Sequence, residues 1–316
     1  MKSRRSIAVV ALLVLAAVNA VAYAHARAML TWAPDGARTP PPEQLSTAGR
    51  LRTLLLGVRI PRPRPTRTPD TLGLPFEAHT LTPPGEPALS LWEVPVEDPR
   101  GTVVLIHGYT AAKDQLLELA PPLREMGWRV VLVDLRGSGD SGGTGTTIGV
   151  TEARDVAAVA AWAPRPVVLY GFSMGAAAAL RAVAAEGATP DGLILEAVFD
   201  RLRTTVGNRF RSMGLPARPG ADLLLFWGGI ISGFDPAGHA PVSYATRVRA
   251  PTLVLHGTED PRAHLAEGRA VYDALAGPSR WVAFEGLGHE LSAVAQPARW
   301  GGAVGAFLEA RAPQGQ

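Results

Sequence analysis

Short apolar runs alternate with longer, partly apolar stretches over the second part of the chain, from about residue 75 onward. Short runs rich in Val, Ile and Leu are typical of strands, and the later runs are almost wholly apolar, as strands covered on both faces must be. We expect strands at 76–81, 88–94, 102–106, 129–133, 167–170, 193–195, 252–256 and 280–284. We expect helices near 113–126, 151–162, 175–186, 263–276 and 297–310. This alternation predicts an α/β fold with a mostly parallel, doubly wound sheet of eight strands.

The interval between the sixth and seventh runs is far longer than one crossover helix needs. We therefore expect a cap-like insertion over about 199–250, inside an α/β domain that covers 76–313. Within the insertion, residues 221–234 are strongly apolar. They could line an apolar acyl pocket or pack as an ordinary helix on the sheet, and the pattern leaves both interpretations open.

An apolar segment near the start of the chain, residues 7–24, is interrupted only by Asn19. As a helix it would span about 27 Å, roughly the thickness of the hydrocarbon layer of a bilayer. Residues 1–26 therefore form either a retained signal anchor or a signal peptide that is cleaved after Ala26. We favour the anchor, because the run is longer than the roughly 7 to 15 residues of a signal-peptide core. The basic residues before it favour a single-pass protein of the cell membrane with an extracytoplasmic domain, and secretion after cleavage is the alternative.

Residues 27–75 have the composition of a linker. Half of the chain's 28 prolines lie between residues 34 and 99, and proline-rich sequence favours extended, semi-rigid backbone. Inside the linker, residues 43–60 have the pattern of a short basic amphipathic helix. Such a helix could lie on a lipid surface or pack on the body, and the sequence favours neither.

Composition limits the classes of function. A chain of 316 residues that is 47% hydrophobic can bury one large core, and the absence of cysteine excludes disulfides, thiolate catalysis and cysteine metal sites. The formal net charge is +3, but residues 1–70 hold 11 Lys and Arg against 3 Asp and Glu, whereas residues 71–316 hold 20 against 25. The positive charge thus lies outside the predicted domain, which argues against nucleic-acid binding.

Residues 171–175, Gly-Phe-Ser-Met-Gly, lie between the apolar run at 167–170 and an alanine-rich helical stretch. This is the context of a nucleophile elbow, a sharp strand-to-helix turn that exposes a catalytic serine, here Ser173. A second Gly-x-Ser-x-Gly match, at 139–143, overlaps a Gly-x-Gly-x-x-Gly dinucleotide pattern. The Gly- and Thr-rich sequence after it is poor helix material, so we favour neither Ser141 as the nucleophile nor a dinucleotide cofactor.

Polar residues follow three of the predicted strands in the order Ser173, Asp260, His289. The carboxyl ends of parallel strands meet at one edge of a sheet, which is where ligands bind. A serine hydroxyl needs an imidazole to accept its proton and a carboxylate to orient that ring. The order Ser, Asp, His differs from the orders in chymotrypsin-like and subtilisin-like enzymes and is typical of another hydrolytic triad. We therefore predict that Ser173, His289 and Asp260 form a catalytic triad.

Other residues compete for two of these positions. Asp260 could instead cap the next helix, which would leave Asp200 as the acid. Only His289 follows the last strand in a Gly-rich loop, so it is favoured over the other candidate histidines, which are His239, His256 and His264. A metal site built from these histidines and Asp260 matches no known ligand spacing, so we expect no metal.

Five motifs recur together in one family. They are His-Gly-Tyr at 107–109, Asp-Leu-Arg-Gly-Ser-Gly-Asp-Ser at 134–141, the segment at 171–175, Leu-His-Gly-Thr-Glu-Asp at 255–260 and Gly-His at 288–289. With them, the chain resembles the α/β-hydrolase family over about 76–308, in its esterase, monoacylglycerol-lipase-like and serine-aminopeptidase-like branch. The sequence at 57–63 and 74–77, with the apolar segment before it, also resembles bacterial membrane-anchored members.

The resemblance implies a serine hydrolase that cleaves carboxylic esters of small molecules through an acyl-enzyme, without a cofactor. It places the oxyanion hole at the backbone N–H groups of Tyr109 and Met174, and we expect His107 to support the oxyanion loop. Asp134 and Arg136 are expected to fix neighbouring loops. The same triad also serves thioesterases, acyltransferases and peptidases, and the fold can serve as a non-catalytic binding protein, so these remain alternatives.

Overall fold

The computed structural model describes residues 2–34, 36–40 and 44–312. Its centre is one sheet in the order β1-β2-β4-β3-β5-β6-β7-β8. The strands are β1 (Glu77–Leu81), β2 (Leu89–Val94), β3 (Thr102–Ile106), β4 (Arg129–Val133), β5 (Val167–Phe172), β6 (Gly192–Glu196), β7 (Thr252–Gly257) and β8 (Ser279–Phe284). The pairs β1–β2 and β2–β4 are antiparallel, and the other pairs are parallel. The predicted mostly parallel sheet of eight strands is therefore confirmed.

The predicted helices of the domain are present as well. They are η3 (Lys113–Leu119) with α3 (Ala120–Glu125), α4 (Glu152–Trp162), α5 (Met174–Ala185), α9 (Leu265–Ala274) and α11 (Pro297–Glu309). The structure adds two short ones, η2 (Pro69–Leu72) and α10 (Ser292–Ala295). The stretch predicted as one helix over 113–126 is divided into η3 and α3, because Pro121 and Pro122 have no N–H to continue a helix and instead begin a new one.

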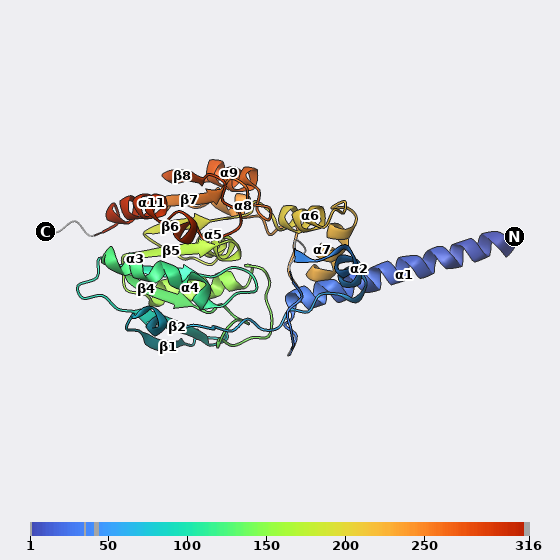
Figure 1. Ribbon diagram of the computed structural model, residues 1–316, viewed down its shortest axis with the longest axis horizontal. Coiled ribbons are helices and arrows are strands. Elements are labelled where there is room, and N and C mark those ends of the chain that lie inside the picture. Colours follow the sequence, from blue (N-terminus) through green and yellow to red (C-terminus); the bar gives the residue numbers. More distant parts are fainter. Residues whose placement is uncertain (1, 35, 41–43, 313–316) are drawn as a thin grey trace.

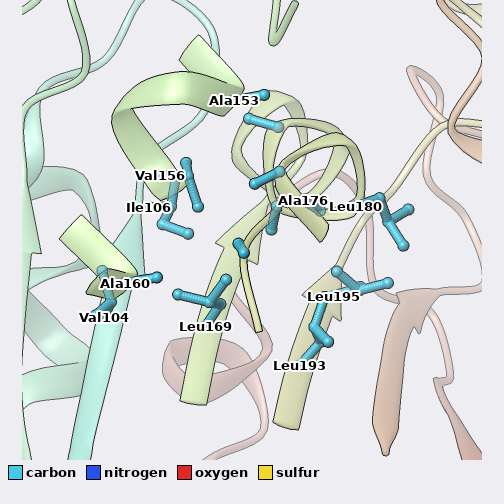
Figure 2. Close-up of a cluster of buried hydrophobic side chains, with 14 of the residues drawn as sticks. Val104, Ile106, Ala153, Val156, Ala160, Leu169, Ala176, Leu180, Leu193 and Leu195 are labelled. Carbon is cyan, nitrogen blue, oxygen red and sulfur yellow. The ribbon is translucent and has the colours of Figure 1, made fainter. Parts of the chain in front are cut away.

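Side chains on one face of the sheet pack against α4 and α5 (Figure 2). Val104 and Ile106 of β3, Leu169 of β5, and Leu193 and Leu195 of β6 are fully buried there. Their neighbours in sequence point to the other face and form a second buried cluster with α3 and α11. Because both faces are covered, these strands are apolar except at Thr102 and Glu196 at their ends, and each fully buried Leu or Val stabilises the fold by about 1.5–3 kcal/mol.

The interval between β6 and β7 carries three helices: α6 (Leu202–Ser212), α7 (Gly220–Ser232) and α8 (Pro241–Ala245). α8 packs on α5 and α9, whereas α6 and α7 lie at the end of the body from which α1 leaves (Figure 1). α7 contains the apolar stretch predicted at 221–234. Its main partners are α1 and α6, so it does not cover the sheet as an ordinary crossover helix would.

α1 (Lys2–Leu30) is one long helix whose first part projects from the body (Figure 1). Residues 5–18 are exposed, whereas the last part buries Ala22, Ala26 and Leu30 at intervals of four residues, with α7 as the main partner. Within the described ranges, α1 alone is long and apolar enough to cross a membrane. It is therefore a candidate membrane anchor or signal sequence.

The predicted amphipathic helix is shorter than expected. α2 (Thr47–Leu56) begins after Ser46, whose hydroxyl accepts a hydrogen bond from the Gly49 N–H (3.1 Å), and it ends at Gly57 with a φ of 88°. The predicted start at residue 43 lies outside the described residues. Both ends are thus set by local capping.

The proline-rich segment after α2 lies along the body. Arg62 donates hydrogen bonds to the carbonyl oxygens of Gly139 (2.9 Å) and Gly143 (2.8 Å) in the loop after β4. Ile60 beside it is buried. The segment therefore packs on the loop that carries the second Gly-x-Ser-x-Gly match.

A buried ion pair holds the start of the same loop. Lys113 Nζ lies 2.7 Å from Asp134 Oδ2, and both side chains are fully buried. Lys113 Nζ also donates to Ser90 Oγ (2.7 Å), and Asp134 accepts from the backbone N–H groups of Lys113 (2.8 Å) and Asp140 (3.1 Å). Asp134 thus fixes the loop after β4, as expected from its position.

Replacing Lys113 with methionine should lower the free energy of unfolding by about 3–5 kcal/mol, because it leaves the Asp134 carboxylate buried without its cation. The matched control is Arg64→Met, which breaks the exposed pair between Arg64 and Asp140 (3.2 Å). The control should cost at most about 1 kcal/mol. Urea denaturation followed by circular dichroism measures both, and equal losses would contradict the role given to the buried pair.

Candidate active site

Ser173 lies at the turn between β5 and α5 with a φ of 52° and a ψ of −111°. Positive φ is unfavourable for a residue with a Cβ atom, so the surrounding chain must impose it. A Cβ added to Gly171 would lie 2.5 Å from the Ala176 nitrogen, and one added to Gly175 would lie 2.2 Å from the Ile106 carbonyl oxygen. The two glycines of the motif are therefore required because backbone passes directly over them.

The structure brings Ser173, His289 and Asp260 together. The distance between His289 Nε2 and Ser173 Oγ is 3.1 Å, and that between His289 Nδ1 and Asp260 Oδ2 is 2.7 Å. The Asp260 side chain is fully buried, and 9% of the His289 side chain is exposed. In the tautomer with a proton on Nδ1, the ring donates to the carboxylate and accepts from the serine hydroxyl. This arrangement can transfer a proton from Ser173 to His289.

The Asp260 carboxylate is held by several donors. Its Oδ1 accepts hydrogen bonds from the backbone N–H groups of Arg262 (2.8 Å) and Ala263 (2.9 Å). Burial by itself would raise the pKa of Asp260, but the hydrogen bond and charge of His289, together with the two N–H donors, lower the pKa below its ordinary value. Asp260 is thus ionised next to the ring that it orients.

The competing residues lie in other environments. Asp200 pairs with Arg201 (2.7 Å), and within the described chain its Oδ1 has no hydrogen-bond partner. His256 Nε2 lies 2.8 Å from the Ala263 carbonyl oxygen, and His264 is the residue at which α9 begins. His239 lies between Tyr244 and the Ile148 carbonyl oxygen, and burial lowers its pKa to about 4. None of these four is bonded to Ser173 in the described structure.

The candidate oxyanion loop follows β3, the strand next to β5. His107 accepts a hydrogen bond from the Leu135 N–H at Nε2 (3.1 Å) and donates from Nδ1 to the Gly108 carbonyl oxygen (2.8 Å). Burial lowers the pKa of His107, so the ring is neutral and braces this loop as expected. The N–H of Met174 belongs to the first turn of α5, where backbone donors have no partner within the helix.

Tyr109 connects this loop to α1. Its hydroxyl donates to the Met29 carbonyl oxygen (2.6 Å), and its ring lies 6.2 Å from that of Trp32. Burial raises the pKa of Tyr109 to about 12, so the phenol stays protonated as a donor. The next residue, Thr110, accepts a hydrogen bond from Arg38 at its carbonyl oxygen (3.3 Å). Local sequence patterns do not indicate these contacts, because the partners are about 70 to 80 positions apart.

A buried glutamate, Glu196 at the end of β6, was also missed. Its backbone oxygen accepts from the Ser173 N–H (2.8 Å), and its carboxylate accepts from the Ser292 N–H (2.6 Å) and the Tyr170 hydroxyl (2.5 Å). Burial raises the pKa of Glu196, although these hydrogen bonds oppose the increase. Glu196 thus connects the serine to the segment that follows His289. The available signal was a lone carboxylate that ends a wholly apolar run.

Known proteins similar to this chain include hydrolases. Residues 97–219 match the family described as serine aminopeptidase, S33. The chain is 30% identical to the lysophosphatidylserine lipase ABHD12 of Rattus norvegicus over 193 residues. This alignment covers 56% of this chain and 46% of the lipase. It is 25% identical to YqkD of Bacillus subtilis over 214 residues, and this alignment covers 64% of this chain and 68% of YqkD. The chain therefore spans about half the length of the lipases it matches.

Solved structures share the fold. The esterase Pf2001 of Pyrococcus furiosus superposes with a TM-score of 0.66 at 22% identity, over 80% of this chain and 97% of the esterase. The chain has the α/β-hydrolase fold. A membrane phospholipase A also superposes, with a TM-score of 0.56 at 23% identity, over 74% of this chain and 86% of the phospholipase. The fold expected from the five motifs is thereby confirmed.

Gly175→Ala should lower the free energy of unfolding by about 3 kcal/mol or more, because the added methyl group would overlap the end of β3. The matched control is Gly301→Ala in α11, where a Cβ meets nothing within 4 Å. That change should stabilise the protein by about 0.5–1 kcal/mol, since alanine is the better helix former. Urea denaturation measures both, and a harmless Gly175→Ala would mean that the elbow is not tightly packed.

Proposed function

We propose that the chain is a serine hydrolase that cleaves carboxylic esters through an acyl-enzyme, with Ser173, His289 and Asp260 as its catalytic triad. The observation that carries this proposal is the continuous chain of hydrogen bonds from Ser173 Oγ through His289 (3.1 Å) to Asp260 (2.7 Å). The strained backbone of Ser173 supports it, since strain of this kind is characteristic of a nucleophile elbow.

The geometry supports the following reaction. Ser173 Oγ attacks the ester carbonyl carbon as its proton passes to His289 Nε2, and Asp260 stabilises the imidazolium. The oxyanion accepts hydrogen bonds from the N–H groups of Met174 and Tyr109, and losing one such donor typically costs about 3 kcal/mol of barrier stabilisation. His289 then protonates the leaving alcohol, and water releases the acid from Ser173 by the same steps.

An acylated, lipid-like ester is the substrate class that fits best. A narrow, open pocket with a cavity volume of about 40 Å³ lies among α1, α6 and α7, and all its lining residues are apolar. Met29, which lines it, also accepts the hydrogen bond from Tyr109 of the candidate oxyanion loop. Similar proteins include a lysophosphatidylserine lipase and a membrane phospholipase A. The pocket is therefore assigned to the acyl chain.

The protein is proposed to stay in the cell membrane through α1, with its catalytic domain outside the cytoplasm. The burial of Ala22 and Ala26 supports retention, because cleavage after Ala26 would remove both residues together with the contacts of Asn19 and Tyr23 with Trp227 of α7. The basic residues before the apolar run support the orientation.

A fluorophosphonate probe tests the triad. We expect labelling at Ser173 that is lost in Ser173→Ala, and we expect Asp260→Asn to lower kcat by about 10³–10⁴-fold while the protein stays folded, because the ring loses its orienting carboxylate. Asp200→Asn, the matched control, should change kcat little. If Asp200→Asn were the more damaging variant, Asp200 would be the acid, and an unlabelled protein would indicate a non-catalytic binding protein.

The acyl pocket is tested with Gly228→Leu. A Cβ at Gly228 points at Leu30 from 3.6 Å, so leucine fits the backbone but fills the pocket. Turnover of p-nitrophenyl decanoate should fall by about tenfold or more, while p-nitrophenyl acetate should be hydrolysed at nearly the original rate. Phe226→Leu, on the exposed side of α7, is the control.

Equal losses of turnover on the two esters would mean that the pocket does not bind the acyl chain of the substrate. Thioesters and aminoacyl p-nitroanilides in the same panel address the alternative leaving groups, the latter because of the match to the serine aminopeptidase family.

A further inference from the structure

Apart from Asp222 in its first turn and Ser232 at its end, α7 consists of apolar residues and glycines, although it lies at the surface of the body. Only Ala221 and Gly228 of this helix are buried. Leu224 and Leu225 line the pocket on its inner side, whereas Phe226 and Ile230 are 57% and 58% exposed on its outer side. A surface helix in water normally presents polar side chains outward, and a helix that is apolar all round is typical of a nonpolar environment.

α2 presents a second exposed apolar face. The helix has no buried residue, and Leu51, Leu55 and Leu56 are 57%, 61% and 74% exposed. Arg50 and Arg52 stand among these leucines. Leucines beside arginines on one short helix are typical of helices that lie in the interface of an anionic bilayer.

Both helices contact the same part of α1 (Figure 1). Trp227 Nε1 of α7 donates to Asn19 Oδ1 (3.2 Å), and the centre of its ring lies 5.4 Å from that of Tyr23. His25 Nε2 lies 2.9 Å from the Leu54 carbonyl oxygen of α2. The two helices therefore lie level with the end of the apolar segment of α1, just beyond its exposed residues 5–18.

The position of α2 and α7 beside α1 indicates which partner would cover their exposed apolar side chains. If α1 crosses a bilayer, residues 19–25 lie where the hydrocarbon layer gives way to the lipid headgroups, and Trp and Tyr side chains such as Trp227 and Tyr23 are enriched at that depth. Arg27, Arg50 and Arg52 would then be close to the headgroups, where basic residues are attracted to anionic lipid. A lipid surface is thus the occupant that matches both the apolar faces and the charge.

We propose that the outer faces of α7 and α2 form, together with α1, a membrane-docking surface that holds the insertion against the bilayer. The docking surface consists of Leu51, Leu55 and Leu56 of α2 and Phe226 and Ile230 of α7. Because the inner side of α7 lines the apolar pocket, docking brings that pocket to the lipid layer. The docking surface is independent of catalysis and goes beyond the proposed function.

The absence of cysteine allows a direct test with single nitroxide labels. Full-length Phe226→Cys, Ile230→Cys and Leu55→Cys are each labelled and reconstituted in vesicles of phosphatidylcholine and phosphatidylglycerol. Leu12→Cys is the reference within the span. Ala185→Cys is the aqueous control, because it is exposed at the end of α5 farthest from Ser173. Power saturation by oxygen and by a water-soluble nickel complex then reports the depth of each label.

Labels at 226, 230 and 55 should be several-fold less accessible to nickel, relative to oxygen, than the label at 185, and should approach the label at 12. Accessibility at 226 and 230 equal to that at 185 would overturn the docking surface. A label at 12 in water would overturn it too, because α1 would then not define a bilayer. Repeating the measurement with Ser173→Ala separates this result from catalysis, since an inactive protein should give the same depths.

Discussion

The candidate site depends on one close backbone contact, between the first turn of α5 and the carboxyl end of β3. At Gly175 the chain passes so near the Ile106 carbonyl oxygen that a single methyl group would lie 2.2 Å from it. This contact leaves Ser173 no room for an ordinary turn and holds it at a φ of 52°. The same contact places the first N–H groups of α5 beside the loop that follows β3. The proposed nucleophile and the proposed oxyanion donors are therefore positioned by the same packing constraint.

The other two members of the proposed triad are held by hydrogen bonds instead of close packing. Asp260 is fixed by two backbone donors of its own turn, and His289 lies on a loop whose far end is bonded to the Glu196 carboxylate. Glu196 also accepts from the Ser173 N–H through its backbone oxygen. Glu196 is thus bonded both to the proposed nucleophile and to the segment that follows the proposed base. The desolvation of its carboxylate is offset by hydrogen bonds from the Tyr170 hydroxyl and the Ser292 N–H, which is how a buried carboxylate is tolerated.

The sheet was predictable because its central strands are covered on both faces, and strands of this kind have nearly continuous apolar sequence. That Ser173, Asp260 and His289 lie close together was predictable, because parallel strands end at one edge of the sheet and each residue follows such a strand. The roles of three other residues were not predictable, because their hydrogen-bond partners are distant in sequence. These residues are Tyr109, Arg38 and Glu196. A local sequence pattern does not indicate which distant group a side chain will bond. The ends of α2 were not predicted: the expected helix ran to residue 60, whereas α2 ends at Leu56 before the Gly57 cap and begins after the Ser46 cap.

Tyr109 connects α1 to the candidate site through two different groups. Its N–H is one of the proposed oxyanion donors, while its hydroxyl is bonded to the Met29 carbonyl oxygen at the end of α1. That carbonyl belongs to the last turn of the helix, where oxygens have no partner within the helix, so the phenol satisfies a group that would otherwise need water. Leu30, one residue on, packs near Gly228 of α7 beneath the proposed docking surface. A tilt of α1 relative to the body would therefore move the pocket wall and the oxyanion loop together. A simple tether would need none of these contacts, which is why α1 is better regarded as part of the folded domain.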